Sequence, residues 1–230
     1  MKKVFYAISL VFAGIIFSSF STDNNCEMYF PTKAGTTFEI TNYDKKGKAT
    51  NVTKHKVISN NGTEIKAHAS IYAKLKDKEP STEMDYAVKC EGDEFHFNIG
   101  SMNMAGSSAM QGMEMEMEGG FVSIPTNPSV GQELKGGDMT VSMGGASMPM
   151  AMSIVTTISN RKVDAIEDVT TPAGTFKCIK ISEDVEVKTI MKVKSKSITW
   201  FAKGVGMVRS ETYNHKGKLM GSSELTQISK

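Results

Sequence analysis

The strongest constraint on the fold of this chain is an alternation of apolar and polar residues with a period of two. From Ile65 to Leu75, isoleucine, alanine and leucine residues alternate with Lys, His, Ser and Tyr. Phe95, Phe97 and Ile99 alternate with polar residues in the same way. Successive side chains of a strand point to opposite faces, so this period predicts strands with one buried face.

Turn sequences rich in Gly, Asn, Asp and Pro separate the alternating runs at short intervals, at 44–47, 60–62, 77–80, 91–93, 136–138, 203–206 and 214–217. Parallel strands would need longer helical connections, so the spacing favours hairpins. We predict an all-β fold: a single antiparallel meander of about 10–12 strands, curled into a barrel or half-barrel that protects its edges. A sandwich is the alternative, and at most one short helix is expected near 105–118.

The first 21 residues have the pattern of a secretory signal peptide. Two lysines precede an apolar run of 14 residues at 4–17, and small serines follow up to Ser21. A membrane-spanning helix needs about 20 apolar residues, and no second such run follows. We therefore expect a signal peptide at 1–21 and a single exported β domain at 22–230, located in the periplasm or cell envelope with no transmembrane span.

The charges of the expected mature chain balance. The full chain has 27 Lys and Arg against 25 Asp and Glu, and the signal peptide removes two lysines and no acid, which leaves 25 of each. Nucleic acids and anionic membranes are bound by concentrated positive charge. The overall balance therefore argues against both as partners, and leaves a small hydrophobic ligand or another envelope protein.

Methionine is the most unusual part of the composition, because 11 of the 17 methionines lie between Met102 and Met152. In 113–118 methionine alternates with glutamate, which places the thioethers on one face of a strand. The later alternation continues into a β-branched isoleucine, which an apolar lining accepts but a metal-ligand set has no reason to include. We predict a hydrophobic cavity lined by Met113, Met115, Met117, Met148, Met150, Met152 and Ile154.

Two other interpretations of these methionines stay open. Thioethers are soft ligands that suit Cu(I), so the Met-x-Met pairs could form a copper site. Its candidate ligands are Met102, Met104, Met113, Met115 and Met117. The segment 101–112 also contains several Gly and Ser residues, as in a loop. In a further alternative, the protein is a structural or partner-binding envelope module without any small ligand.

Three cysteines remain after export, in a compartment that permits disulfide bonds. Cys26 and Cys90 lie near predicted strand ends, and we expect them to form a disulfide that contributes about 4 kcal/mol. Cys178 shares a strand face with Phe176 and is expected to be a small buried residue. Lipidation of Cys26 would need a small residue before it, whereas 23–25 is Asp-Asn-Asn, so we expect a protein that is not lipidated.

No catalytic or phosphate-binding motif is present in the sequence. Paired acids such as Glu183-Asp184 are better explained as solvated strand residues than as an acid–base pair. We therefore expect a non-enzymatic envelope protein that holds a hydrophobic, lipid-like ligand and needs no cofactor, with copper as the alternative.

Three stretches of the chain resemble the TapB-like family of exported bacterial proteins. They are Thr-Thr-Pro-Ala-Gly-Thr-Phe-Lys-Cys at 170–178, Trp-Phe-Ala-Lys-Gly-Val-Gly-Met-Val-Arg-Ser-Glu at 200–211 and Gly-Lys-Leu-Met at 217–220, together with the start at 26–47. The motifs consist of turn glycines, a Pro-led hairpin and core aromatics. The resemblance implies an all-β, barrel-like periplasmic domain and brings no catalytic residues with it.

Overall fold

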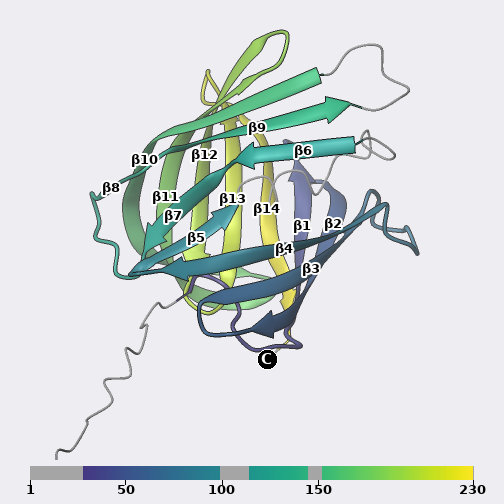
Figure 1. Cartoon of the computed structure of the whole chain (residues 1–230), viewed down its shortest axis with the longest axis vertical. Helices are drawn as coiled ribbons and strands as arrows, with labels where there is room; N and C mark the ends of the chain where they lie inside the picture. Colours follow the sequence, from purple (N-terminus) through teal and green to yellow (C-terminus); the bar gives the residue numbers. More distant parts are fainter. Residues whose placement is uncertain (1–27, 99–113, 145–151, 230) are drawn as a thin grey trace, which may run out of the picture.

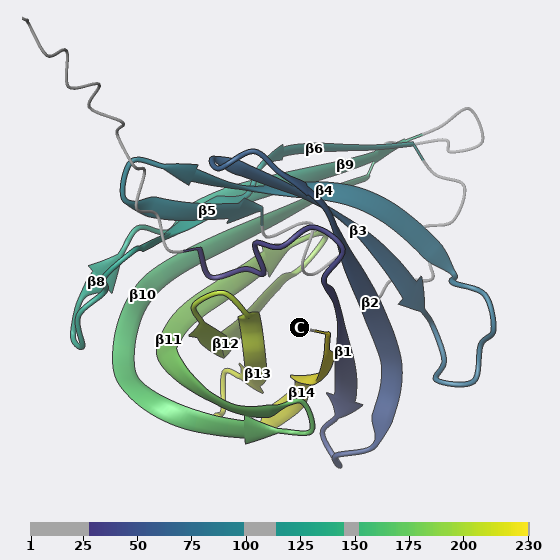
Figure 2. The same cartoon turned by 90° about the horizontal axis from the view of Figure 1, so that it is seen from below.

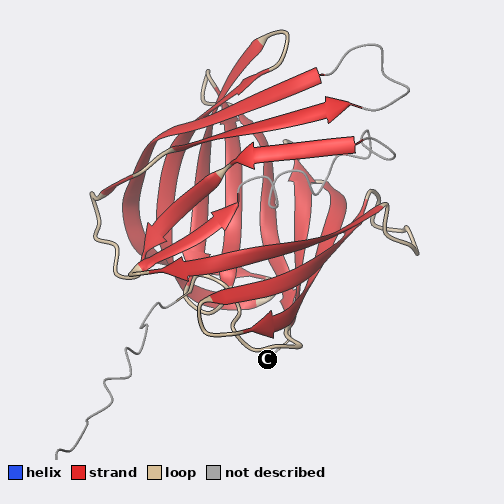
Figure 3. Ribbon diagram, viewed as in Figure 1, coloured by secondary structure: helices blue, strands red, loops and turns tan. Residues whose placement is uncertain are grey.

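The computed structural model describes residues 28–98, 114–144 and 152–229, and all of its regular structure is β-strand (Figure 1, Figure 3). The 14 strands are β1 Thr37–Asp44, β2 Ala49–Asn60, β3 Glu64–Tyr72, β4 Thr82–Glu91, β5 Glu94–Asn98, β6 Glu114–Gly119, β7 Phe121–Pro125, β8 Glu133–Leu134, β9 Gly137–Gly144, β10 Met152–Thr171, β11 Gly174–Lys188, β12 Lys192–Ala202, β13 Gly206–Asn214 and β14 Leu219–Ile228. None of the described residues belongs to a helix long and apolar enough to cross a membrane.

The strands form one antiparallel sheet that curls into an open half-barrel (Figure 2). Its order is β6, then β9 to β14, then β1 to β5, and finally β7, while the short β8 pairs with β10. The predicted curled antiparallel sheet is confirmed. Its 14 strands exceed the expected 10–12, and its two meanders, β9–β14 and β1–β5, are joined by pairing of β14 with β1. The prediction allowed at most one short helix near 105–118. From 114 onward this stretch is strand β6, and its earlier part lies outside the described residues.

The two edges of the sheet are linked by one continuous segment of chain. Strand β6 pairs with β9 at one edge, and β7, which follows at once, pairs with β5 at the other. Gly119 and Gly120 make the change of partner, with φ of +72° and +82°, and the Gly120 N–H donates to the Asp138 carbonyl at 2.8 Å. A Cβ on Gly119 would lie 2.5 Å from the Asp138 carbonyl oxygen. We call this link between the two edges, at Gly119–Gly120, the seam. Only glycine fits there without strain.

The concave face of the sheet carries the main core. Ile65, Ala67 and Ile71 are at most 2 % exposed, and Phe95 and Phe97 are also buried, as the alternation predicts. Leu75 departs from the prediction, because β3 ends at Tyr72 and the Leu75 side chain is half exposed. The predicted position of Ile99 lies outside the described residues.

One end of the half-barrel is closed by the segment that precedes β1. Met28, Tyr29 and Phe30 are buried against the inner face of the sheet. This arm is held by the Gly204 N–H, which donates to the Met28 carbonyl at 2.8 Å, and by Asn60 Nδ2, which donates to the Thr32 carbonyl at 2.8 Å. Figure 2 shows the arm (purple) crossing this end. We call it the plugged end.

Candidate ligand cavity

The half-barrel encloses a cavity of about 470 Å³ between the plugged end and the opposite end of the sheet. This is within the roughly 300–1,000 Å³ range of small-molecule sites. Aromatic side chains form its inner part, which we call the aromatic base: Tyr29, Phe30, Phe38, Phe95, Phe97 and Phe201. Their rings contact one another at centroid distances of 5.6–6.3 Å. The base is therefore a packed apolar surface.

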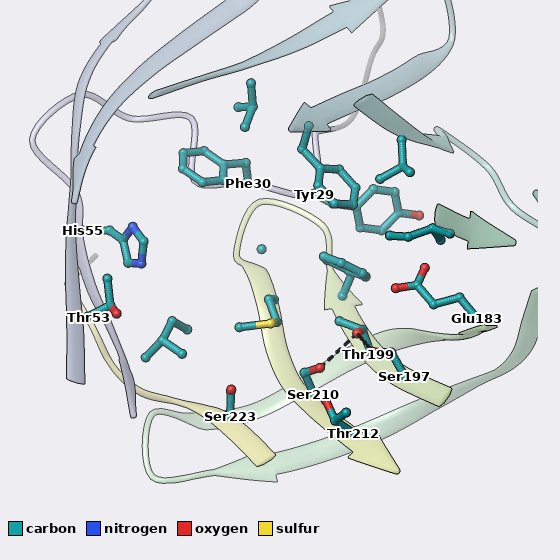
Figure 4. Close-up of a pocket in the computed structure, with 18 of the residues that line it drawn as sticks. Tyr29, Phe30, Thr53, His55, Glu183, Ser197, Thr199, Ser210, Thr212 and Ser223 are labelled. Carbon is teal, nitrogen blue, oxygen red and sulfur yellow. Dashed lines mark hydrogen bonds between the residues drawn. The ribbon is translucent and has the colours of Figure 1, made fainter. Parts of the chain in front are cut away.

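A row of polar side chains crosses the cavity wall above this base. Strand register places them side by side on five adjacent strands, β12, β13, β14, β1 and β2. We call this row the polar rung: Thr199, Ser210, Ser223, Asn42 and Asn51. Its members bond to one another, as Figure 4 shows for Thr199 and Ser210, whose hydroxyls are 3.1 Å apart. Ser223 Oγ donates to Asn42, and Asn42 Nδ2 donates to Asn51 Oδ1 at 2.6 Å.

Exposure of the wall increases from the aromatic base toward the hairpin turns. On β12, Phe201 and Thr199 are buried, whereas Ser197 and Ser195 are half-buried. On β13, Thr212 lies beyond Ser210 and is exposed. The cavity therefore opens at the end where the β1–β2, β11–β12 and β13–β14 turns lie. We call it the open end.

A partly buried histidine, His55, lies at the boundary between the base and the rung. His55 stacks on Phe38 with ring centroids 4.5 Å apart, and its Nδ1 lies 2.8 Å from the Tyr86 hydroxyl. Burial lowers the pKa of His55 from 6.5 to about 4 and raises the pKa of Tyr86. At neutral pH this pair is an uncharged hydrogen-bonding group. It suits an uncharged polar atom of a ligand better than an anionic one.

Arg161 supplies the only guanidinium of the described cavity wall, and an irregularity in β10 places it there. Pairing of β10 with β11 shifts between Ser159 and Lys162, and Asn160 has a φ of +50°. Such a bulge inserts one residue and reverses which side chains face inward. Ile158 before the bulge and Val163 after it are both buried in the main core. The bulge thus turns Arg161 into the interior.

The buried Arg161 guanidinium connects three parts of the sheet. Its Nη1 donates to the Ser123 carbonyl on β7 at 2.9 Å and to the Lys135 carbonyl, just before β9, at 2.7 Å. Its Nε donates to Glu183 on β11 at 3.1 Å. Burial raises the pKa of Glu183, and the positive charge of Arg161 opposes this shift. Because Ser123 and Lys135 lie on opposite sides of the seam, Arg161 fastens the two edges of the half-barrel.

The predicted methionine lining is not among the described cavity residues, whose one methionine is Met207. Met113, Met148 and Met150 lie outside the described residues, and for Met115, Met117 and Met152 only the backbone in β6 and β10 is described. Ile154 packs with Met139 and Val141 in a small separate cluster. That the seven predicted residues line a cavity stays a prediction.

The copper hypothesis also stays a prediction, since Met102 and Met104 lie outside the described residues. In the described part of the chain, no group of three or more His, Cys, Asp or Glu side chains could hold a metal ion. Cys90 is buried, but Cys26 lies outside the described residues, so the disulfide remains predicted. Cys178 is a free thiol with no exposed surface, as expected, and burial raises its pKa to about 12.

Two solved structures share this fold over most of the chain. One is a predicted exported protein with a YmcC-like fold from Bacteroides fragilis, with a TM-score of 0.75 and 23 % identity over 89 % of this chain and 100 % of that protein. The other is a predicted lipoprotein from Parabacteroides distasonis, with a TM-score of 0.77 and 20 % identity over 89 % of this chain and 100 % of that one. At these identities the likeness establishes the fold alone.

No match to the chain is found among curated proteins. A family model described as DUF3108-like matches residues 33–225, which span the sheet from the start of β1 to Leu225 within β14. The more specific TapB-like resemblance stays a prediction. Since the match covers most of its length, the chain belongs to the DUF3108-like family.

Proposed function

We propose that this protein is a non-catalytic binding protein of the cell envelope that holds an amphipathic small molecule in its cavity. The ligand has an apolar chain, which lies against the aromatic base, and an uncharged head with several hydroxyl groups, which lies at the polar rung. An acyl chain esterified to glycerol or a sugar has this chemistry. The observation that carries the proposal is the division of one cavity into an apolar and a hydrogen-bonding half.

The apolar half supports a hydrocarbon chain because its aromatic side chains are already buried and packed on one another. Phe95 and Phe97 are 1 % and 7 % exposed and contact each other at 5.7 Å. Binding of an apolar group removes its surface from water without the cost of ordering flexible side chains. Met207 is the one flexible apolar side chain of the described lining.

The polar half supports a neutral, hydroxylated head. Hydroxyl and amide groups of the polar rung both donate and accept hydrogen bonds, so they suit sugar or glycerol hydroxyls. The neutral His55–Tyr86 pair adds a further polar group at the boundary. Arg161 does not provide an anion site, because its bonds to Glu183, Ser123 and Lys135 already engage it.

The envelope location rests on the predicted signal peptide. It is supported by the two solved structures of the same fold, whose proteins are named as a predicted exported protein and a predicted lipoprotein.

Binding can be tested with a pair of variants on one strand. Ser223 faces the cavity, whereas its neighbour Ser222 is not part of the lining. We expect Ser223→Phe to fill the cavity and reduce the affinity for a monoacylglycerol probe at least tenfold, measured by titration calorimetry. Ser222→Phe should bind as the parent protein does. Circular dichroism and thermal melting check that both variants fold.

A second experiment asks what the protein carries in its own host. Native mass spectrometry of protein released without detergent should show an added apolar mass, which Ser223→Phe loses. No added mass in the parent protein, together with no binding of the monoacylglycerol probe, would refute the proposal.

A further inference from the structure

The open end carries a concentration of positive charge that the overall balance conceals. Three turns lie next to one another there, because the sheet order is β11, β12, β13, β14, β1 and β2. Their segments, 44–48, 186–196 and 213–218, contain two carboxylates, Asp44 and Glu186, and nine exposed lysines. We call these lysines the basic rim: Lys45, Lys46, Lys48, Lys188, Lys192, Lys194, Lys196, Lys216 and Lys218.

The turns of the plugged end have no such excess of lysines. The segments 60–64, 91–94, 171–174 and 203–205 contain Lys203 and four acids, of which Glu64 pairs with Lys66 and Lys89 on the adjoining strands. The excess of lysines is therefore confined to the open end. An uneven charge distribution of this kind orients a protein at an anionic surface even when its net charge is zero.

The β11–β12 turn adds exposed apolar side chains to this charge. Ile190 is 97 % exposed, Met191 is 74 % exposed and Val193 is 59 % exposed. Figure 1 shows this hairpin (yellow-green) extending beyond its neighbours at the top of the molecule. An apolar tip flanked by lysines suits the membrane interface, where apolar groups enter the acyl boundary and ammonium groups stay among the lipid heads.

The two carboxylates among these lysines are both ionised and locally engaged. Glu186 pairs with Lys192 at 3.0 Å and with Lys194 at 3.5 Å, and these contacts lower its pKa. The Asp44 carboxylate accepts the backbone N–H groups of Lys46 and Lys48, which lower its pKa. The exposed Asp184 on β11 lies opposite Lys196 and is a third carboxylate beside the rim. The three acids reduce the positive charge but leave an excess of six lysines.

The mouth of the cavity adjoins this surface. Val185 and Ser195 line the main cavity and also a second, more open hollow. The charged residues of its wall are Lys194, Lys196, Asp184 and Glu186. The hollow lies between the β11–β12 hairpin and the β13–β14 turn. A surface in contact with the basic rim would therefore also face the cavity mouth.

We propose that the open end docks onto the surface of an anionic lipid bilayer, with Ile190 and Met191 inserted among the lipids and the basic rim against their head groups. The proposal does not depend on what the cavity holds. It corrects the inference from overall charge, because the sequence count averages over two ends that differ in charge. A purely polyanionic partner would account for the lysines but not for the exposed apolar tip.

Vesicle flotation tests the proposal with the mature protein. We expect binding to vesicles of phosphatidylcholine and phosphatidylglycerol, weak binding to phosphatidylcholine alone, and a decline of binding as salt rises. Near an anionic surface each lysine contributes about a fivefold gain in affinity. Replacing Lys188, Lys192 and Lys216 by Gln should therefore weaken binding on the order of a hundredfold.

The apolar tip distinguishes a bilayer from other polyanions. Ile190→Ser combined with Met191→Ser should weaken vesicle binding at least tenfold, while Ile58→Ser combined with Val130→Ser, at exposed apolar positions elsewhere, should leave it unchanged. Binding of the tip variant at the parent affinity would overturn the proposal. So would equal binding of both vesicle types, or DNA binding with the same lysine dependence and affinity as vesicle binding. Unchanged melting temperatures would exclude unfolding of the variants as the cause.

Discussion

The two ends of the half-barrel are built from the same strands but differ in packing, polarity and charge. At the plugged end, the inner faces carry phenylalanine and aliphatic residues, and the 28–30 arm fills the remaining space. At the open end the same strands present Ser, Thr and Asn to a cavity and lysines to the solvent. The difference shows how one sheet can place its stability in one half and its binding surface in the other.

The largest contrast is expected between a residue of the aromatic base and one of the polar rung. Phe95→Ala removes a ring packed against Tyr29 and Phe97 and should lower the free energy of unfolding by about 3–5 kcal/mol. Ser210→Ala loses one hydrogen bond to Thr199 and should cost about 1 kcal/mol or less. Urea denaturation measures both. Similar losses would contradict the division into a packed and a hollow half.

A substitution of Arg161 tests whether its hydrogen bonds hold the two edges of the half-barrel together. Arg161→Met leaves Glu183 buried without its partner and two carbonyls without their donor, which should cost about 3–5 kcal/mol. Adding Glu183→Gln should restore part of this loss. Arg209→Met, which breaks a partly exposed ion pair with Glu211 on the convex face, should cost about 1 kcal/mol at most. If Arg161→Met lowers the free energy of unfolding no more than Arg209→Met does, Arg161 does not hold the two edges together.

The pKa of His55 measures how far water is excluded from the boundary between the aromatic base and the polar rung. Its pKa is about 4 in the folded protein and 6.5 when unfolded, so the unfolded state binds the proton more readily. The contribution of His55 to the free energy of unfolding should therefore be complete above pH 6.5 and fall by about 3 kcal/mol as the pH drops to about 4. Below about pH 4 this group should cause little further loss. Denaturation across this pH range, compared with His55→Phe, measures the effect. The same pH slope in both proteins would show that water reaches the ring.

Two glycines with nearly the same φ distinguish backbone strain from a steric clash at the Gly119–Gly120 seam. Gly119 and Gly217 have φ of +72° and +71°, but a Cβ would meet the Asp138 carbonyl only at Gly119 and has open space at Gly217. Gly217→Ala should cost about 1 kcal/mol, and Gly119→Ala about 2 kcal/mol or more. Thermal unfolding compares them. Equal losses of stability in the two variants would mean that the backbone at the seam can move away from the added Cβ at no cost in free energy.

The strands were predictable because burial on one face leaves a period of two in the sequence. Ile65, Ala67, Phe95 and Phe97 follow it and are buried. Leu75 also follows it and is not, because the alternation continues past the end of β3. Periodicity records which residues could share a face, but not where pairing stops.

Arg161 could not be recognised as an interior residue because a bulge lies just before it. Strict alternation from Ile158 would direct Asn160 inward and Arg161 outward. The polar rung left a weak signal in the run Lys-Ser-Lys-Ser-Ile-Thr at 194–199, where the lysines are exposed and the inward positions are hydroxylated. An alternation of lysine with serine is polar on both faces, so it does not show which face is turned inward.

Pairing of β1 with β14 sets the order in which the protein can be completed. The Thr37 N–H donates to Ser229 Oγ at 2.8 Å across a separation of 192 residues. A chain that emerges N-terminus first therefore presents β1 long before its partner strand exists, and closing so long a loop slows folding. During that delay the edge of β1 that will pair with β14 is open to other strands, so this interval carries a risk of aggregation.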